Sequence, residues 1–505
     1  MTTEEKRIEL VALFEEFWQE SRARREQYAR NEKLYLEQAM GRPSTRSHPR
    51  TGTPVLYATY RQELADAVEL MPEAVFLARR GQDEQRADNL TRLHRALLER
   101  MDFADVYRSV CENRARLGVG YTEITVKDGE NKVVSFDPRA ILTDPMTEDL
   151  QEGRAVFKIS YHPMEYFRAH YPKAYRRMKP ENPACMENAD GKRIALITAY
   201  YKTFEKGKSR VHEMKMAGGA VLYHSVSEHP EGVCAHGEYP IVAWYYDRLP
   251  GTPWGFGAFD YLAPVQSYID KVDTLVMQNL ARSAKPRLMV NRAAGLDLEA
   301  LRDEEQEVIL ADRIDESAIR WQECAPMAPY AVQMLLQKCD MLKTESGQNA
   351  ASRGEMPSNA TSGTAISMLQ AAGSKRTNLH QAAINQAFLK MVRQIVSNLA
   401  ACGTKDVFFR TEEGYQVLKT ADALGDWEYD LQVRLQRMPQ YESVYQNQLL
   451  MQLVQMGTLS PETGFALMDL SNKEAILKGI RKGVNTDGKS NESGDDESRK
   501  REGTT

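Results

Sequence analysis

Pro253-Trp-Gly-Phe-Gly257, Leu262-Ala-Pro-Val-Gln266 and Lys285-Pro-Arg-Leu288 mark the start, the body and the end of one long apolar stripe. Its members recur every three or four residues, which is the spacing of one side of an α-helix: Leu262, Val265, Ile269, Val272, Val276 and Leu280. Because the residue before a proline disfavours the helical conformation, Pro286 should end this helix at Lys285. The sequence therefore predicts a helix over residues 258–285 that follows a glycine-rich turn.

A second helix is predicted to begin at Pro329. Proline is tolerated in the first helical turn because the N–H that it lacks would have no partner there. Apolar residues at helical spacing follow: Val332, Leu335, Leu336, Cys339 and Leu342. Between the two helices, residues 287–325 contain strand-like Arg287-Leu-Met-Val290, a charged helix from Leu296 to Glu305, and strand-like pieces around Val308 and Ile319. A small mixed module is thus inserted between two helices.

Turn-forming residues dominate the sequence after the second helix. Residues 346–361 are rich in Gly, Asn and Ser without apolar periodicity, which predicts a mobile loop. A long helix is predicted from Ser362 to Ala401, with Gly373 as a kink. Its expected buried side is Ile366, Leu369, Ala383, Ala387, Met391, Ile395 and Leu399. We expect strands in 405–436, helices in 440–482, and a disordered, charged tail from Gly483.

Residues 4–250, which precede the glycine-rich turn, change from a helical to a strand pattern. Apolar residues at helical spacing over 4–40, 55–71 and 83–117 predict a mostly helical first quarter, interrupted at Pro72 and Arg80-Gly81. The helical pattern ends at Gly118-Val119-Gly120, and residues 121–250 predict a β-rich unit with short helices such as 163–170. Gly218-Gly219 indicates a hairpin turn between the strands 210–216 and 220–223.

Composition limits the kind of protein. The chain has 505 residues, 42% of them hydrophobic, so it can form several packing units. Its net charge of -5 argues against a strongly basic nucleic-acid binder. The six cysteines are scattered without metal-ligand spacing, which predicts reduced thiols. The sequence has no secretion signal and no run of roughly 18 apolar residues. We therefore expect assembly in a cytoplasm and no association with a membrane.

The order of these elements resembles the portal proteins of tailed bacteriophages, the head-to-tail connectors, over residues 20–480. Leu117-Gly118-Val119-Gly120-Tyr121 is similar to the helix-to-strand transition of that family, and Asp137-Pro138 with Asp144-Pro145 to its paired Asp-Pro turns. The layout from Pro253 to Leu288, and Ser362-Gly-Thr-Ala-Ile366 at the start of the long helix, also resemble portal sequences. The chain departs from the family in lacking a long C-terminal coiled coil, so only a modest crown is expected.

The resemblance implies a helix-rich α+β portal fold that assembles into a ring. The implied segments are a wing (1–255), stem helix 1 (256–285), a clip (286–325), stem helix 2 (326–345), a channel loop (346–361), a long kinked helix (362–402), wing strands (403–438), crown helices (439–482) and a disordered tail (483–505).

The same resemblance implies a mechanical function at a capsid vertex of the virion. A homo-oligomer, expected to be a dodecamer, would form the channel for packaging and ejection of double-stranded DNA. The clip would dock the large subunit of terminase and afterwards head-completion or adaptor proteins, and the wing would face the major capsid and scaffold proteins. No enzymatic activity, cofactor or metal is implied.

Two groups of residues are candidates for these contacts. The candidates for the DNA channel are Asn349, Ser352, Arg353 and Glu355 in the loop, with Lys271 and Arg282 on the first helix. The candidates for docking partners at the clip are Lys285, Arg287, Arg292, Glu304, Glu305 and Arg313. The alternative for the basic residues is a solvated helix face or salt bridges between subunits.

Three features of the sequence bear on functions other than that of a portal. Gly483-Val-Asn-Thr-Asp-Gly488-Lys489-Ser490 matches a phosphate-binding loop, but it lacks the preceding strand and following helix that such a loop needs. An ATP-driven DNA translocase and an adaptor or scaffold ring that never contacts DNA remain alternatives. Gly255-Phe-Gly257 lacks the third glycine and the βαβ context of a dinucleotide site. His224, His229 and His236 lack ligand spacing, so surface or structural roles are expected.

Overall fold

The computed structural model describes residues 2–40, 53–284, 287–290, 319–322, 329–346, 375–402, 407–411, 414–418, 427–435 and 440–460. Short gaps occur inside the range 53–284, and the longest of them is 187–192. A few positions outside these ranges are also described. It is a mixed α+β structure with two compact units. One unit comprises Met1–Val68 and Pro72–Arg434, and the other Glu69–Met71 and Leu435–Thr505.

Helices form most of the first quarter, as predicted. They are α1 (Thr3–Glu20), α2 (Arg22–Met40), α3 (Val55–Glu69), α4 (Glu84–Arg100) and α5 (Phe103–Leu117). Thr2 begins α1 with a capping box, in which Glu5 N–H donates to Thr2 Oγ1 (3.2 Å) and Thr2 N–H donates to Glu5 Oε2 (2.8 Å). α5 ends where Gly118 adopts a φ of +86°, a left-handed conformation that glycine tolerates.

The strand β1 (Pro72–Ala78) was not predicted, although Pro72 was correctly expected to end the preceding helix. Its buried residues alternate along the strand, with Ala74 and Phe76 inside. β1 pairs with β16 (Tyr429–Leu435), which lies far away in the sequence. Local pattern could not reveal this strand because its partner is remote.

Two antiparallel sheets form the β-rich region predicted for residues 121–250. The order β3-β2-β9 contains β2 (Val119–Lys127), β3 (Glu130–Phe136) and β9 (Ile241–Tyr245). The order β4-β5-β6-β7-β8 contains β4 (Ile141–Thr143), β5 (Ala155–Pro163), β6 (Arg193–Glu205), β7 (Lys208–Ala217) and β8 (Ala220–His224). β7 and β8 form the hairpin predicted at Gly218-Gly219. Short helices α6 (Met164–His170) and α7 (Pro172–Tyr175) follow β5.

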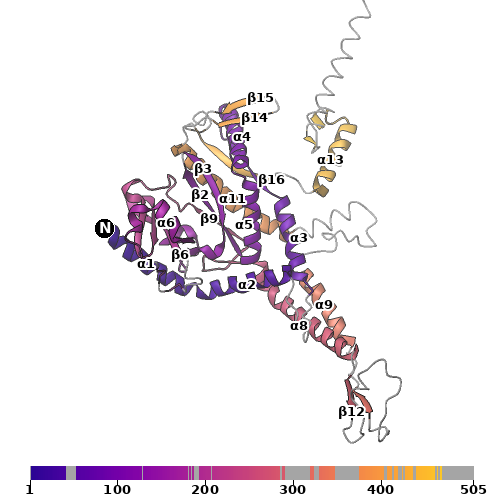
Figure 1. Cartoon of the computed structure of the whole chain (residues 1–505). Coiled ribbons are helices and arrows are strands. Elements are labelled where there is room, and N and C mark those ends of the chain that lie inside the picture. Colours follow the sequence, from indigo (N-terminus) through magenta and orange to yellow (C-terminus); the bar gives the residue numbers. More distant parts are fainter. Residues whose placement is uncertain are drawn as a thin grey trace, which may run out of the picture. The chain divides into compact units, whose positions relative to one another are not determined.

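Aromatic and aliphatic side chains bury one face of each sheet. Phe14 and Phe17 of α1 pack edge-on against Phe157 of β5, with ring centroids 5.4 and 5.7 Å apart. The long helix α11 (Lys375–Cys402) packs against β9, β2 and β3 (Figure 1). Met391, Ile395 and Leu399 are buried as predicted, and residues 362–374 of the expected helix lie outside the described residues.

The helix–module–helix arrangement is also present. α8 (Ala258–Ala284) and α9 (Pro329–Glu345) lie side by side, with β12 (Arg287–Val290) beyond them (Figure 1). β12 pairs antiparallel with β13 (Ile319–Gln322), from Arg287 opposite Gln322 to Val290 opposite Ile319. The charged helix expected at 296–305 and the strand expected near Val308 lie outside the described residues.

The remaining predicted elements agree where they are described. β14 (Val407–Thr411) and β15 (Gly414–Leu418) form a hairpin in the larger unit. In the smaller unit, α13 (Gln440–Gln455) matches the start of the helices predicted for 440–482. Residues 469–505, including the predicted tail, lie outside the described residues.

Candidate functional site

The α8–α9 pair carries the one predicted channel residue whose side chain is described. Lys271 lies on an exposed position of α8, and no hydrogen bond or ion pair is seen for it among the described residues. Arg282 lies near the end of α8, and Arg287 is the first residue of β12. The other candidates lie outside the described residues: Asn349, Ser352, Arg353, Glu355, Lys285, Arg292, Glu304, Glu305 and Arg313.

Burial along α8 changes from one half of the helix to the other. Leu262 and Ile269 are fully buried, where α8 approaches α2 and α5. Leu275 is 65% exposed and Leu280 is 58% exposed. Within the part of the chain that the structure describes, the apolar stripe is therefore buried at Leu262 and Ile269 and exposed at its far end, Leu280.

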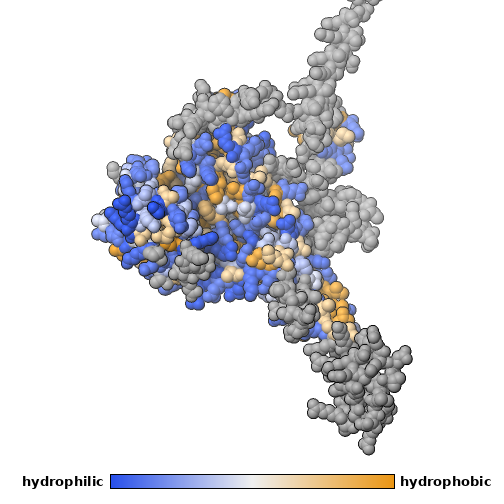
Figure 2. Space-filling model, viewed as in Figure 1, coloured by the Kyte–Doolittle hydropathy of each residue, from blue (hydrophilic) through white to orange (hydrophobic). Residues whose placement is uncertain are grey.

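α9 is apolar on opposite sides. Tyr330 is 70% exposed and Leu336 is 60% exposed, and Val332, Met334 and Met341 are also exposed. Residues two positions apart on a helix point in nearly opposite directions, so Tyr330 and Val332 lie on different sides. α8 contacts one region, where Tyr268 Oη donates to Met334 Sδ (3.2 Å). Figure 2 shows hydrophobic surface on the viewer's side of this helix pair. Exposed apolar side chains gathered on a helix in this way mark a surface that packs against a partner.

Three glycines form the joint where α8 begins. A Cβ placed on Gly255 would lie 1.9 Å from the carbonyl oxygen of Gly118, and one on Gly257 would lie 2.6 Å from the Gly118 nitrogen. The Gly118 carbonyl also accepts a hydrogen bond from Tyr246 N–H (2.9 Å). The motifs 117–121 and 253–257, which carried the portal resemblance, are thus one backbone-to-backbone contact. Gly255 and Gly257 serve that contact and are not part of a dinucleotide-binding turn.

A buried ion pair lies beside this joint. Arg24 Nη2 of α2 is 3.0 Å from Asp260 Oδ2 of α8, with side chains 10% and 2% exposed. The same Nη2 donates to the carbonyls of Leu117 (2.8 Å) and Gly255. Burial opposes the charge of Arg24, but Tyr28 and Asp260 outweigh this effect and raise the pKa of Arg24. Sequence analysis missed this pair because its members are far apart in the chain.

Asp260 also orders the first turn of α8. Its Oδ2 accepts a hydrogen bond from Gly257 N–H (2.9 Å), and its Oδ1 accepts one from Asn31 Nδ2 (2.9 Å). An anionic side chain at this end of a helix is favoured by the helix dipole. The carboxylate therefore joins α2 to the start of α8 from both oxygens.

A second buried contact holds α8 two turns further along. Gln266 is fully buried, and its Nε2 donates to the Thr53 carbonyl (2.9 Å) and to Asp270 Oδ1 (2.8 Å). Its Oε1 accepts from Leu56 N–H at the start of α3 (2.9 Å). The first half of α8 is thus fixed by polar contacts as well as by apolar packing.

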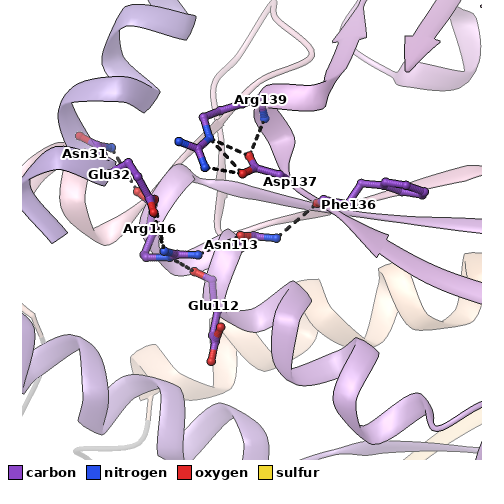
Figure 3. Close-up of polar contacts among 8 residues, drawn as sticks. All are labelled: Asn31, Glu32, Glu112, Asn113, Arg116, Phe136, Asp137 and Arg139. Atoms are coloured by element: carbon purple, nitrogen blue, oxygen red, sulfur yellow. Dashed lines mark hydrogen bonds and ion pairs between the residues drawn. The ribbon is translucent and has the colours of Figure 1, made fainter. Parts of the chain in front are cut away.

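A separate polar network joins α2 to α5 and to the first Asp-Pro turn (Figure 3). Arg116 Nη1 is 3.2 Å from Glu32 Oε2, and its Nη2 donates to Asn113 Oδ1 (3.1 Å). Asp137 accepts from Arg139 N–H (2.9 Å) and from the Arg139 guanidinium. Burial would raise the pKa of Asp137, but the hydrogen bonds from Arg139 prevail and lower it. Asp137 thereby acts as the cap of a short 3-10 turn.

Comparison with protein families decides the class of the chain. The family model described as Phage P22-like portal protein matches residues 11–502, which is nearly the whole sequence. The chain belongs to this portal family. Membership confirms the resemblance to tailed-phage portal proteins. It implies a structural protein of the virion that forms a homo-oligomeric ring associated with the capsid. No curated protein matches the sequence.

Histidine, cysteine and acidic side chains were the other candidates for site chemistry in this portal chain. No group of three or more His, Cys, Asp and Glu side chains is placed to hold a metal within it. His224 has a structural role, with Nε2 2.8 Å from Tyr201 Oη, and His236 Nδ1 accepts from Glu238 N–H (3.1 Å). Cys111, Cys185, Cys234 and Cys339 are free thiols, as predicted. The phosphate-loop match at 483–490 lies outside the described residues.

One further property of this portal chain concerns membranes. None of the helices that the structure describes combines the length and the apolar character needed to cross a bilayer.

Proposed function

We propose that this chain is the subunit of a portal ring whose α8–α9 helices line the channel for packaging and ejection of double-stranded DNA. The observation that carries the proposal is the exposure of apolar side chains on opposite sides of α9, with Tyr330 on one side and Val332 on the other. Every subunit of a closed ring has two neighbours, and each neighbour covers a different surface. A helix pair that needs cover on two sides fits such a ring, expected to be a dodecamer.

The charge of the chain suits a channel through which DNA slides. Tight binding of phosphates requires several clustered cations, and such binding would oppose movement. The net charge is -5, and Lys271 is a basic residue at an exposed position of α8, without an ion pair among the described residues. Lys271, Arg282 and the loop candidates Asn349, Ser352, Arg353 and Glu355 are proposed to contact DNA weakly during translocation.

The module between α8 and α9 is proposed as the docking site for other proteins. Its first strand, β12, lies beyond the helix pair (Figure 1). Terminase would dock there during packaging, and head-completion or adaptor proteins afterwards. The candidate contacts are Lys285, Arg287, Arg292, Glu304, Glu305 and Arg313. The sheets and the N-terminal helices would face capsid and scaffold proteins, with assembly in the host cytoplasm.

Native mass spectrometry combined with negative-stain imaging tests the ring. Burying a leucine stabilises by about 1.5–3 kcal/mol, so covering the exposed 60% of Leu336 contributes about 1–2 kcal/mol per interface. We expect rings from the wild type and monomers from Leu336→Glu. The matched control is Phe204→Glu, which changes a side chain that is 76% exposed at the end of β6.

Each outcome has a definite meaning. Rings from wild type and Phe204→Glu, but not from Leu336→Glu, support α9 as an interface between subunits. Rings of normal mass from Leu336→Glu would show that α9 does not lie between subunits. DNA packaging by a variant lacking residues 346–361 separates a channel from an adaptor ring, because an adaptor that never contacts DNA tolerates the deletion.

A further inference from the structure

We propose that Arg24 and Asp260 are positioning residues that fix the direction in which α8 leaves the body of the subunit, and thereby set the number of subunits in the ring. The inference rests on the proposed ring and extends it to the control of ring size. It is carried by the buried ion pair and the glycine joint beside it, which lie outside every candidate contact predicted from the sequence.

One guanidinium group joins the segments that meet where α8 begins. Arg24 extends from α2, and its Nη2 reaches the Leu117 carbonyl at the end of α5, the Gly255 carbonyl and the Asp260 carboxylate of α8. Acceptors from three segments thus converge on one charged nitrogen, and these segments cannot move far apart without losing charge-assisted hydrogen bonds. Rotation of α8 about its first turn would break several of these bonds together.

The surroundings leave the joint little freedom. Gly118, Gly255 and Gly257 bring two backbones so close that a Cβ on any of them would lie 1.9 to 2.6 Å from a backbone atom of the other segment. The ion pair itself is almost inaccessible to water, and loss of one partner leaves an uncompensated buried charge. Tight backbone contact and a buried ion pair together indicate a rigid joint.

A rigid joint matters for a ring because closure is sensitive to small angles. Neighbouring subunits of a dodecamer are related by a rotation of about 30°, and gaining or losing one subunit changes this rotation by only about 3°. In a ring, the exposed second half of α8 and the body of the subunit repeat around the same axis. If α8 changes direction by a few degrees relative to the body, the body can close with a different number of copies.

The chain provides a matched control for this inference. Glu32 and Arg116 form another partly buried ion pair, 3.2 Å apart with side chains 18% and 14% exposed, and it joins α2 to α5. Neither residue is seen to contact α8. Glu32→Gln therefore removes a comparable charge from α2 without affecting the direction of α8.

The test is native mass spectrometry of full-length rings of wild type, Arg24→Lys, Asp260→Asn and Glu32→Gln, with thermal unfolding of each. Arg24→Lys keeps the charge on a shorter side chain, which moves the charged nitrogen away from the position of Nη2. Asp260→Asn keeps an acceptor for Gly257 N–H and loses the charge. We expect one dominant ring size for wild type and Glu32→Gln. Both junction variants should give at least two ring sizes in comparable amounts, whatever their melting temperature.

A single unchanged ring size in Arg24→Lys and Asp260→Asn would overturn the inference, even if both melted at lower temperature, because it would show a purely structural role. A broadened distribution in Glu32→Gln as well would also overturn it, since any loss of charge on α2 would then have the same effect. Absence of rings from the wild type would instead contradict the proposed function, which distinguishes the two failures.

Discussion

His94 should make the stability of this chain depend on pH. The residue lies on α4 and is 1% exposed, with its ring 5.9 Å from that of Phe76 and 6.3 Å from that of Phe388 on α11. Neither ring nitrogen has a hydrogen-bond partner among the described residues. Burial lowers the pKa of His94 from 6.5 to about 4. The neutral ring is therefore part of the packing between α4 and α11.

The direction and size of the effect follow from these pKa values. As pH falls below 6.5 the unfolded chain binds a proton at His94, whereas the folded chain does so only near pH 4. The contribution of neutral His94 is complete above pH 6.5 and is lost between pH 6.5 and 4. A shift of one pKa unit corresponds to about 1.4 kcal/mol, so the free energy of unfolding should fall by about 3 kcal/mol at pH 4 from this group.

Urea unfolding of wild type and His94→Phe at pH 7 and pH 4, in the same assembly state, measures the effect. Phenylalanine fits an aromatic cluster and does not titrate, so His94→Phe should lose about 3 kcal/mol less than wild type over this range. The exposed His229 supplies the control, because His229→Phe should retain the pH dependence of the wild type. Equal losses in wild type and His94→Phe would refute the assignment of a buried, neutral His94.

Three further predictions concern the joint, the loop and the tail. Gly118→Ala should lower the free energy of unfolding by about 1–3 kcal/mol more than Gly129→Ala in denaturant titrations. Both positions have a positive φ, but only Gly118 has backbone atoms where the Cβ would lie, so equal effects would contradict the close contact. Deletion of 346–361 should impair DNA packaging without abolishing rings, as seen by packaging assay and imaging. Purified protein should show no ATP turnover that Lys489→Ala removes, and such turnover would favour a translocase.

Much of the local structure could be predicted from the residues. The apolar stripe from Leu262 and the position of Pro286 predicted α8, and Pro329 predicted the first residue of α9. Gly118 predicted the end of α5, and Gly218-Gly219 predicted the β7–β8 turn. These features depend on neighbours within a few positions, and steric and hydrogen-bonding preferences act at that range.

The family resemblance was also available from the sequence, because it depends on the order and spacing of short motifs. The sequence did not reveal the physical reason for two of those motifs. Only the structure showed that Gly118 on one side and Gly255 and Gly257 on the other are in backbone contact. A sequence specifies which positions are glycine, but the tertiary fold decides which backbone segment occupies the space that a Cβ would fill there.

Burial and charge pairing were decided by the tertiary structure alone. The helical stripe on α8 did not indicate that Ile269 is buried while Leu280 is exposed, because cover comes from helices elsewhere in the chain. The Arg24–Asp260 pair and the β1–β16 pairing unite residues separated by hundreds of positions. Propensity and periodicity act within one segment, so the sequence determined the helices, turns and family of this chain. Contacts between distant segments determined the joint, the exposed apolar surface and the buried His94.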